Sequence, residues 1–147
     1  MKSLIIIPAY NEEACIEQTV RDILEHAPNF DYIVINDCSK DRTKEICEKN
    51  HFHYIDLPVN LGIGGAVQTG YKYACNHGYD YAVQVDGDGQ HDPRFLEQML
   101  QVMQEKKLDM LIGSRLLPRR LSVVRTASYR YQILYLADPS ADRKNHH

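Results

Sequence analysis

The stretch Val85-Asp86-Gly87-Asp88-Gly89-Gln90-His91-Asp92-Pro93 decides how the rest of the chain is interpreted. It follows the apolar run Tyr81–Val85, which is typical of a buried strand. It ends at Pro93, a favoured first residue of a helix. Asp86 and Asp88 therefore lie in a tight turn at the end of a strand. Two carboxylates this close repel each other unless a cation lies between them, and Mg²⁺ or Mn²⁺ prefers such oxygen ligands. An acidic turn with solvated charges is the alternative.

The rest of the chain alternates between short apolar runs and helical patterns. Consecutive apolar and β-branched residues, as in Leu4–Ile7, suit strands covered on both faces of a parallel sheet. Helices are indicated where apolar residues recur at three- and four-residue spacing. The pattern predicts an α/β fold with a mainly parallel sheet in a three-layer α/β/α arrangement. Strands are expected at 4–7, 32–35, 52–55, 81–85 and 110–112, and helices at 12–27, 41–50, 66–76 and about 95–103.

Length and composition limit the class of protein. The 147 residues suit one domain, and 44% hydrophobic with 25% charged residues is ordinary for a globular chain. A formal net charge of −3 argues against general nucleic-acid binding, and no apolar run is long enough to span a bilayer. Met1–Pro8 lacks a cleavage site and is better interpreted as a first strand than as a signal peptide. The four cysteines form no Cys-x-x-Cys pair, which favours reduced thiols in a cytoplasmic protein.

Polar and glycine-rich clusters follow the expected strands. In open α/β sheets, ligands bind at the edge formed by the carboxyl ends of the strands. Five separate clusters on that edge are difficult to attribute to surface variation, so we expect a ligand site there. The clusters are 8–12, 36–41, 60–65, 86–90 and 113–115.

Each cluster also has a simpler explanation when it is taken alone. Asn36-Asp37 can accept hydrogen bonds from a base or a ribose, or Asp37 can bind its own backbone in a turn. The glycine-rich Asn60–Gly65 loop can cradle phosphate or can be a flexible entry to a helix. It fits neither the dinucleotide nor the P-loop fingerprint. Arg115 can face a diphosphate or water, and Tyr10 can stack on a base or fill the edge of the core.

Five motifs occur in order along the chain: Pro-Ala-Tyr-Asn-Glu-Glu (8–13), Asn-Asp-Cys-Ser-Lys-Asp-Arg-Thr (36–43), Asn-Leu-Gly-Ile-Gly-Gly-Ala (60–66), Asp-Gly-Asp-Gly-Gln-His-Asp-Pro (86–93) and Gly-Ser-Arg (113–115). Together they resemble the family-2 glycosyltransferases, particularly the branch that makes polyprenyl- or dolichyl-phosphate sugars. The resemblance covers residues 1 to about 118 and is specific for the family, but not for the sugar or the acceptor. It implies a GT-A fold, here with a C-terminal truncation, and a nucleotide-diphosphate sugar as donor.

The resemblance also implies roles for individual residues. Asp86, Asp88 and Gln90 would hold Mg²⁺ or Mn²⁺ against the donor diphosphate. Asp88 and Arg115 would be catalytic, because the bound ion and the guanidinium stabilise the charge on the departing nucleotide. The residues that would bind the nucleotide-sugar are Pro8, Ala9, Tyr10, Glu12, Asp37, Gly65 and Asp86.

Two positions depart from the family pattern. Cys38 replaces the glycine that usually follows the aspartate, and Arg42 replaces the glycine that usually precedes the threonine. Both substitutions put a larger side chain into a turn, so the loop is expected to have a different shape. Donor binding is still expected, because the Asp37 carboxylate is retained.

These expectations define an inverting glycosyltransferase. It would move a sugar from a UDP- or GDP-linked donor to an acceptor such as a polyprenyl phosphate at the inner face of the membrane. A hydroxyl acceptor needs a general base, whereas a phosphate acceptor is already an anion, and the last third of the chain offers no convincing base. Two alternatives are a remnant that binds nucleotide-sugar without transfer and a nucleotidyltransferase. The latter is disfavoured, because its glycine-rich, lysine-containing N-terminal loop is missing.

The end of the chain does not follow the family pattern. We therefore divide the chain into a nucleotide-sugar-binding domain at 1–118 and a divergent basic tail at 119–147. Apolar residues from Leu117 onward approximate a helical stripe beside arginines, which is typical of a helix lying on a membrane surface. A truncated or disordered end is the other interpretation. The stripe consists of Leu117, Leu121, Val124, Tyr131 and Leu134.

Overall fold

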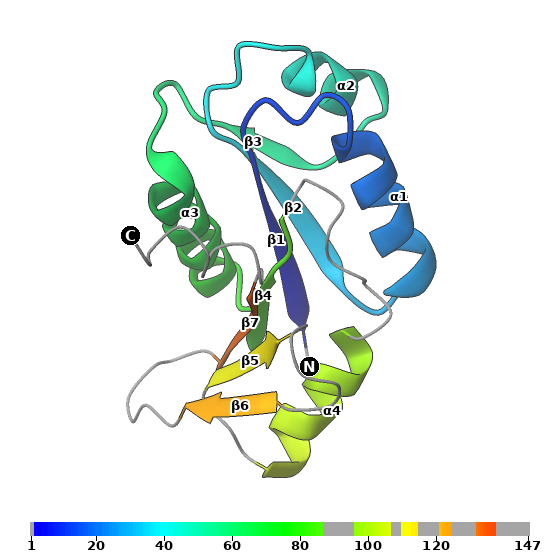
Figure 1. Ribbon diagram of the computed structural model, residues 1–147, viewed down its shortest axis with the longest axis vertical. Helices are drawn as coiled ribbons and strands as arrows, with labels where there is room; N and C mark the ends of the chain where they lie inside the picture. The colour runs from blue at the N-terminus through cyan, green and yellow to red at the C-terminus, as the bar shows by residue number, and fades with distance from the viewer. Residues whose placement is uncertain (1, 87–95, 107–109, 115–120, 125–131, 138–147) are drawn as a thin grey trace, which may run out of the picture.

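The computed structural model describes residues 2–86, 96–106, 110–114, 121–124 and 132–137 (Figure 1). Strands and helices alternate over most of the chain, and the last elements are strands. The elements are β1 Ser3–Ala9, α1 Ile16–His26, β2 Asp31–Asn36, α2 Thr43–Lys49, β3 Tyr54–Asp56, α3 Gly62–Asn76, β4 Tyr81–Gln84, α4 Leu96–Lys106, β5 Met110–Ser114, β6 Leu121–Val124 and β7 Gln132–Ala137. No helix among the described residues is long and apolar enough to cross a membrane.

The described strands form one seven-stranded sheet in the order β3-β2-β1-β4-β7-β5-β6. Neighbouring strands are parallel except β5 and β6, which are antiparallel. Within this sheet Ile6 of β1 lies between Ile33 of β2 and Gln84 of β4. The chain first builds outward from β1 to β3 and then crosses back to add β4 on the other side of β1. The strand order therefore reverses between β1 and β4, the position at which open α/β sheets bind ligands.

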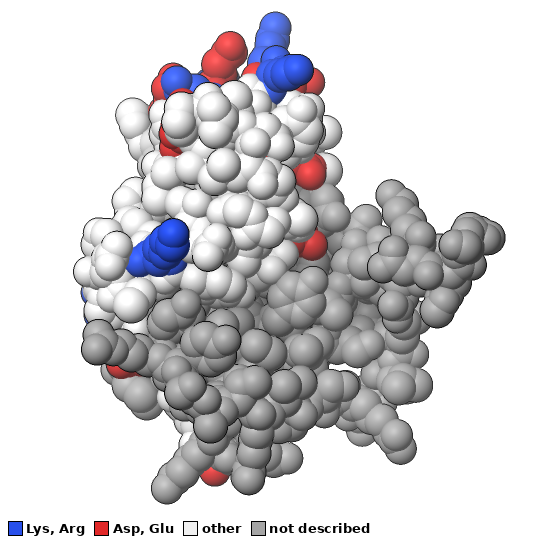
Figure 2. Space-filling model, turned by 90° about the vertical axis from the view of Figure 1, so that its left-hand side faces the viewer, with Lys and Arg blue, Asp and Glu red and all other residues white. Residues whose placement is uncertain are grey.

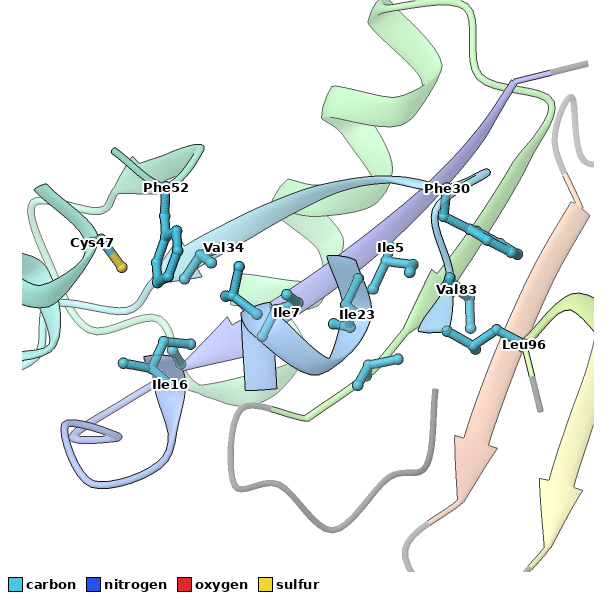
Figure 3. Close-up of a cluster of buried hydrophobic side chains, with 14 of the residues drawn as sticks. Ile5, Ile7, Ile16, Ile23, Phe30, Val34, Cys47, Phe52, Val83 and Leu96 are labelled. Atoms are coloured by element: carbon cyan, nitrogen blue, oxygen red, sulfur yellow. The ribbon is translucent and has the colours of Figure 1, made fainter. Parts of the chain in front are cut away.

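Helices cover both faces of the sheet, which confirms the predicted α/β/α arrangement (Figure 1). The side chains of β1 alternate between two apolar clusters, because successive residues of a strand point to opposite faces. Ile5 and Ile7 pack with residues of α1, α2 and α4 (Figure 3), whereas Leu4 and Ile6 pack with α3. All seven residues of β1 are buried, so this strand is the centre of both clusters.

Helix α3 lies very close to β1, and a glycine makes the approach possible. A Cβ atom added to Gly70 would lie 2.3 Å from Cγ2 of Ile6. The helix begins at Gly62 rather than at the expected residue 66, and Gly62 has a φ of +77°. Most of the predicted glycine-rich loop is therefore the first turn of α3.

The end of the described chain differs from the expectation. The predicted helical stripe is wrong at Leu121, Val124 and Leu134, which lie in strands β6 and β7. Its other two members, Leu117 and Tyr131, lie outside the described residues. Strand β7 lies inside the sheet, with β4 on one side and β5 on the other. Its spacing of apolar residues alone cannot separate a short buried strand from a helix. The division of the chain at residue 118 stays a prediction.

Candidate functional site

The candidate site lies where β1, β2 and β4 end side by side. Since these strands are parallel, their carboxyl ends share one edge. Strand β1 ends at Ala9 and β2 ends at Asn36, and Ala9 and Asn36 are paired in the register. The amide of Asp37 donates to the carbonyl of Ala9 over 2.9 Å. The residues that follow β1 and β2 are thus held beside each other at the point where the strand order reverses.

The segment after β1 presents an aromatic ring next to a buried backbone. Pro8 and Ala9 are buried within the strand, whereas Tyr10 is 44% exposed. The next residue, Asn11, has a φ of +53°, which turns the chain sharply. Glu12 is half-buried, and its backbone amide donates to the Thr43 hydroxyl over 2.9 Å. Tyr10 is therefore the predicted site residue of this segment whose side chain is most open to a ligand.

Asp37 is buried and fixes the position of the glycine-rich segment. Its side chain Oδ1 accepts a hydrogen bond from the Leu61 amide at 2.6 Å, and its carbonyl accepts from the Asn60 side chain at 3.1 Å. With 3% of its surface exposed, the Asp37 carboxylate joins the end of β2 to the start of α3. This contact differs from the turn in which Asp37 would bind its own backbone. The side-chain amide of the neighbouring Asn36 donates a hydrogen bond to the Asp56 carboxylate over 2.9 Å.

The glycine-rich segment packs tightly at one position and is open at another. A Cβ added to Gly65 would lie 2.6 Å from Cβ of Leu61, so Gly65 permits the turn to close on itself. At Gly64 an added Cβ would meet no heavy atom within 4 Å. Leu61 and Ile63 are 49% and 62% exposed.

The described surface on the α3 side is poor in charge. Figure 2 shows that the described surface on this side carries few Lys, Arg, Asp or Glu side chains. A hollow of about 270 Å³ opens there between α3 and the end of β4, lined by Ile63, Gly64, Val67, Gln68, Tyr71 and Gln84.

Asp86 follows β4 on the same edge. The Val85 amide donates to the carbonyl of Ile6 at 2.9 Å, which continues the pairing of β4 with β1. Gln84 donates through its side-chain amide to Oδ1 of Asp86, also at 2.9 Å. Asp86 is half-buried in this arrangement. The other predicted ligands and the predicted phosphate-binding arginine, Asp88, Gln90 and Arg115, lie outside the described residues.

A separate group of potential metal ligands lies on α1. Within the described part of the chain, Asp22, Glu25 and His26 are the side chains close enough together to share one ion. They occupy the second half of a helix that runs back from the carboxyl edge, and Glu25 and His26 are exposed. This group is therefore not part of the predicted metal site.

The four cysteines lie in the described part of the chain and form no disulfide with one another. Burial, with a smaller effect of Glu48, raises the pKa of the Cys47 thiol to about 11. Cys47 therefore stays protonated near neutral pH and packs as an apolar residue of the core.

Asp41 and Thr43 were missed as site residues by the sequence interpretation. Asp41-x-Thr43 was interpreted as the start of a helix, and the Asp41 carboxylate does accept from the Thr43 amide at 2.9 Å. Partial burial raises the pKa of Asp41, but hydrogen bonds from Thr43 and the Glu13 amide outweigh it, so the pKa lies below its ordinary value. The sequence carried no signal that Thr43 also binds the segment after β1.

The three-layer fold with a ligand edge at the strand reversal is that of the GT-A nucleotide-sugar transferases. Residues 4–145 match the family model "Glycosyl transferase family 2", and the chain belongs to this family. It is 32% identical to an undecaprenyl-phosphate mannosyltransferase of Micrococcus luteus over 123 residues, which cover 80% of this chain and 50% of the relative. It is 35% identical to a UDP-N-acetylglucosamine–dolichyl-phosphate N-acetylglucosaminyltransferase of Methanococcus voltae over 130 residues, covering 76% of this chain and 51% of that one. The chain thus spans about half the length of these relatives.

Solved structures agree with the fold. Residues 1–349 of the S. aureus protein TarS, in complex with UDP, match with a TM-score of 0.65 and 26% identity, covering 81% of this chain and 38% of that fragment. Glucosyl-3-phosphoglycerate synthase of Mycobacterium tuberculosis, in complex with Mn²⁺ and UDP-glucose, matches with a TM-score of 0.62 and 22% identity, covering 77% and 43%. The latter similarity supports the GT-A fold alone.

Proposed function

We propose that this chain binds a nucleoside-diphosphate sugar and transfers its sugar, with inversion, to a polyprenyl phosphate. The observation that carries the proposal is that Ala9, Tyr10, Asp37 and Asp86 lie at the edge formed by the carboxyl ends of β2, β1 and β4. Tyr10 offers an exposed ring for a base. Oδ1 of Asp37 already accepts from the Leu61 amide, so the acceptor proposed for a base amide or a ribose hydroxyl is the other oxygen of this carboxylate.

A divalent cation fits the donor set of the segment that begins at Asp86. Two carboxylates and one amide oxygen, from Asp86, Asp88 and Gln90, are hard oxygen ligands of the kind that Mg²⁺ or Mn²⁺ prefers. The bound ion would supply charge neutralisation of the diphosphate leaving group. Arg115 would act on the same diphosphate as a planar, permanently charged donor. Asp37 and Tyr10 would hold the nucleoside so that its diphosphate lies beside the ion and the Arg115 guanidinium.

The acceptor is proposed from the relatives. Their names specify undecaprenyl-phosphate and dolichyl-phosphate as acceptors. A phosphate oxygen is already an anion near neutral pH, so it can attack the anomeric carbon without a general base. A lipid-linked acceptor would bring the protein to the cytoplasmic surface of a membrane.

The first test is calorimetric titration of UDP and then GDP, with and without Mn²⁺. We expect one nucleotide to bind in the presence of the ion, because its diphosphate and the carboxylates need the cation between them. Asp88→Ala should abolish the metal-dependent part. Asp22→Ala is the matched control. It removes a carboxylate from α1, outside the proposed site, and should bind as the wild type does. Failure of both nucleotides to bind under any metal would remove the proposed donor site.

A second measurement separates transfer from binding alone. Wild type is incubated with the nucleotide-sugar that binds and with a polyprenyl phosphate in detergent, and glycolipid is assayed by chromatography. Formation of glycolipid supports the transferase. Binding without glycolipid or sugar release supports a domain that holds the donor and transfers nothing.

A further inference from the structure

The loops after β1 and β2 are joined by a set of hydrogen bonds that runs in both directions. From the first loop, the amides of Asn11, Glu12 and Glu13 donate to side chains of the second. From the second loop, amides donate back to the Asn11 and Glu13 side chains. The bonds are Asn11 N to Ser39 Oγ (3.0 Å), Glu12 N to Thr43 Oγ1 (2.9 Å), Glu13 N to Asp41 Oδ2 (3.1 Å), Lys40 N to Asn11 Oδ1 (2.9 Å) and Arg42 N to Glu13 Oε2 (3.3 Å).

Thr43 is the buried centre of this set. Its side chain has 0% of its surface exposed. The Oγ1 atom donates its proton to Oδ1 of Asp41 at 2.5 Å and accepts from the Glu12 amide at 2.9 Å. Because a hydroxyl carries one proton, donation to Asp41 leaves its lone pairs for the Glu12 amide. Asp41 therefore sets the orientation of the Thr43 hydroxyl, and that hydroxyl holds the first loop.

The two joined loops are held in conformations that ordinary residues rarely adopt. Asn11 in the first loop has a φ of +53°, and Cys38 in the second has a φ of +57°. Left-handed backbone at residues other than glycine persists where surrounding contacts determine it. The same two loops carry Tyr10 and Asp37, the residues to which we assign nucleoside binding. The hydrogen bonds are thus placed to fix one side of the nucleoside site relative to the other.

We infer that Thr43, oriented by Asp41, is a positioning residue that holds the Tyr10–Glu12 loop against the Asp37 loop and preforms the nucleoside site. This inference rests on the proposed function for its ligand, but its structural part does not. Thr43 touches no substrate in this proposal. It acts through the Glu12 amide, and a ligand would then bind without first ordering the two loops.

The test compares Thr43→Val with Thr43→Ser and with Thr19→Val. Valine keeps the volume but removes the hydroxyl, whereas serine retains it. Thr19 is a second buried threonine, with 5% of its surface exposed, on α1 outside these loops. Amide hydrogen exchange of residues 11–13 and 39–43 is measured without ligand, and the dissociation constant of the nucleotide with Mn²⁺ is measured by calorimetry.

We expect Thr43→Val to speed exchange at the Glu12 and Glu13 amides and to weaken nucleotide binding about tenfold, which corresponds to the loss of one hydrogen bond near an ordered site. Thr43→Ser should restore both values to within about twofold of wild type. Thr19→Val is expected to change thermal stability but not the affinity. Asp41→Asn should give the intermediate result in both measurements, because an amide can still accept from the hydroxyl.

Each outcome decides a different step. Unchanged exchange in Thr43→Val overturns the inference, because the loops would then not depend on the hydroxyl. Faster exchange with unchanged affinity also overturns it, because the loops would not need to be positioned for binding. If wild type binds neither UDP nor GDP, the proposed function fails, and the exchange data alone then judge whether Thr43 holds the loops together.

Discussion

Cys38 occupies a backbone conformation that favours glycine, which gives its departure from the family pattern a physical cost. Its φ is +57°, and a left-handed conformation costs a residue with a Cβ about 1–2 kcal/mol. Replacing Cys38 by glycine removes this cost. Part of the benefit, about 0.5–1 kcal/mol, is offset because glycine makes the unfolded chain more flexible. Cys38→Gly is therefore expected to raise the free energy of unfolding by about 0.5–1 kcal/mol, as measured by urea denaturation.

Arg42 is the matched control for this prediction. It also replaces a family glycine, but its φ is −87°, outside the left-handed region that favours glycine. Arg42→Gly should bring no gain in stability, since it adds freedom to the unfolded chain without relieving strain. Equal gains at Cys38 and Arg42 would show that the left-handed backbone is not the cause.

Asp41 predicts a pH dependence of stability. Its pKa in the folded protein is below its ordinary value, because hydrogen bonds to the carboxylate outweigh the effect of burial. A group with a lowered folded pKa stabilises the fold above its unfolded pKa, and this stabilisation is lost as the pH falls through the folded pKa. Hydrogen bonds to a charged acceptor are about 1 kcal/mol stronger than those to a neutral one, so Asp41→Asn should cost about 1 kcal/mol at neutral pH. The difference from wild type should shrink as the solution is acidified below about pH 4.

The measurement is the free energy of unfolding of both proteins between pH 7 and the acid transition. Asp22→Asn is the control, because Asp22 lies on α1 and accepts from the Gln18 side chain of the same helix. A difference between wild type and Asp41→Asn that stays constant over the whole range would contradict the assignment of the effect to the ionised carboxylate.

At the scale of elements, the contact of α3 with β1 depends on Gly70. An added Cβ would meet Ile6 at 2.3 Å from Cγ2 and 2.9 Å from Cγ1. Both Gly70 and Ile6 are buried, so neither neighbour can move into solvent. Gly70→Ala is expected to cost about 1–3 kcal/mol through overpacking, although alanine is the better helix former. Thermal or urea denaturation measures this cost.

Gly64 on the same helix provides the opposite control. An added Cβ there meets nothing within 4 Å, so Gly64→Ala should stabilise the protein by up to about 1 kcal/mol. Gly70→Ala combined with Ile6→Ala should cost less than the sum of the two single changes, because the clash is removed. If the costs of the two single changes add exactly in the double variant, a clash with Ile6 is not the reason why Gly70→Ala is destabilising.

The elements that were predicted correctly are those whose signal is local. The apolar run Leu4–Ile7 lies in β1, and the helical pattern predicted after Pro93 leads into α4. Both were predictable because the spacing of apolar residues indicates which face of a strand or helix is buried. Strand β7 was missed because Gln132–Ala137 is placed by pairing with β4 and β5, which are distant in the sequence. The early start of α3 was missed because glycines lower helix propensity. In the structure the Leu61 amide donates to Asp37 and the Gly62 amide donates to the Asn60 side chain at this start.

The position of the site was predictable from the sequence, but the contacts between its loops were not. Strand ends and turn residues indicated that Ala9 and Asp37 lie on one edge, and the structure brings them together. No spacing rule indicated that the Asp37 carboxylate binds the Leu61 amide, or that Thr43 binds Glu12. Such contacts join loops from different strands, so they follow from the order of strands in the sheet and not from any one segment.

At the scale of the whole molecule, β1 connects the stability of the fold to the site. Its residues contribute to the apolar clusters on both faces of the sheet, and its carboxyl end leads into the loop that carries Tyr10. The partners that hold this loop lie on the neighbouring strand's loop. Unfolding of the sheet therefore removes the site, and a ligand that binds the site stabilises the sheet by mass action.

This linkage gives a prediction that tests metal and nucleotide together. At a nucleotide concentration of 100 times the dissociation constant, with Mn²⁺, the free energy of unfolding should rise by about 2.7 kcal/mol. For a chain of this size, that corresponds to a rise in Tm of roughly 5–10 °C, measured by differential scanning fluorimetry. Removing the ion with EDTA should abolish most of the rise, because the diphosphate would again face unneutralised carboxylates.

Two variants locate the effect. Asp86→Ala should lose most of the nucleotide-dependent rise in Tm, because it removes a carboxylate on the edge beside β1, whereas Asp22→Ala on α1 should retain it. An equal rise in Tm with EDTA would mean that the nucleotide binds without the ion, and Asp86 would then have to act on the ribose alone. An equal loss in both variants would mean that the ion stabilises the fold through carboxylates in general, and the edge between β1 and β4 would no longer be distinguished as its site.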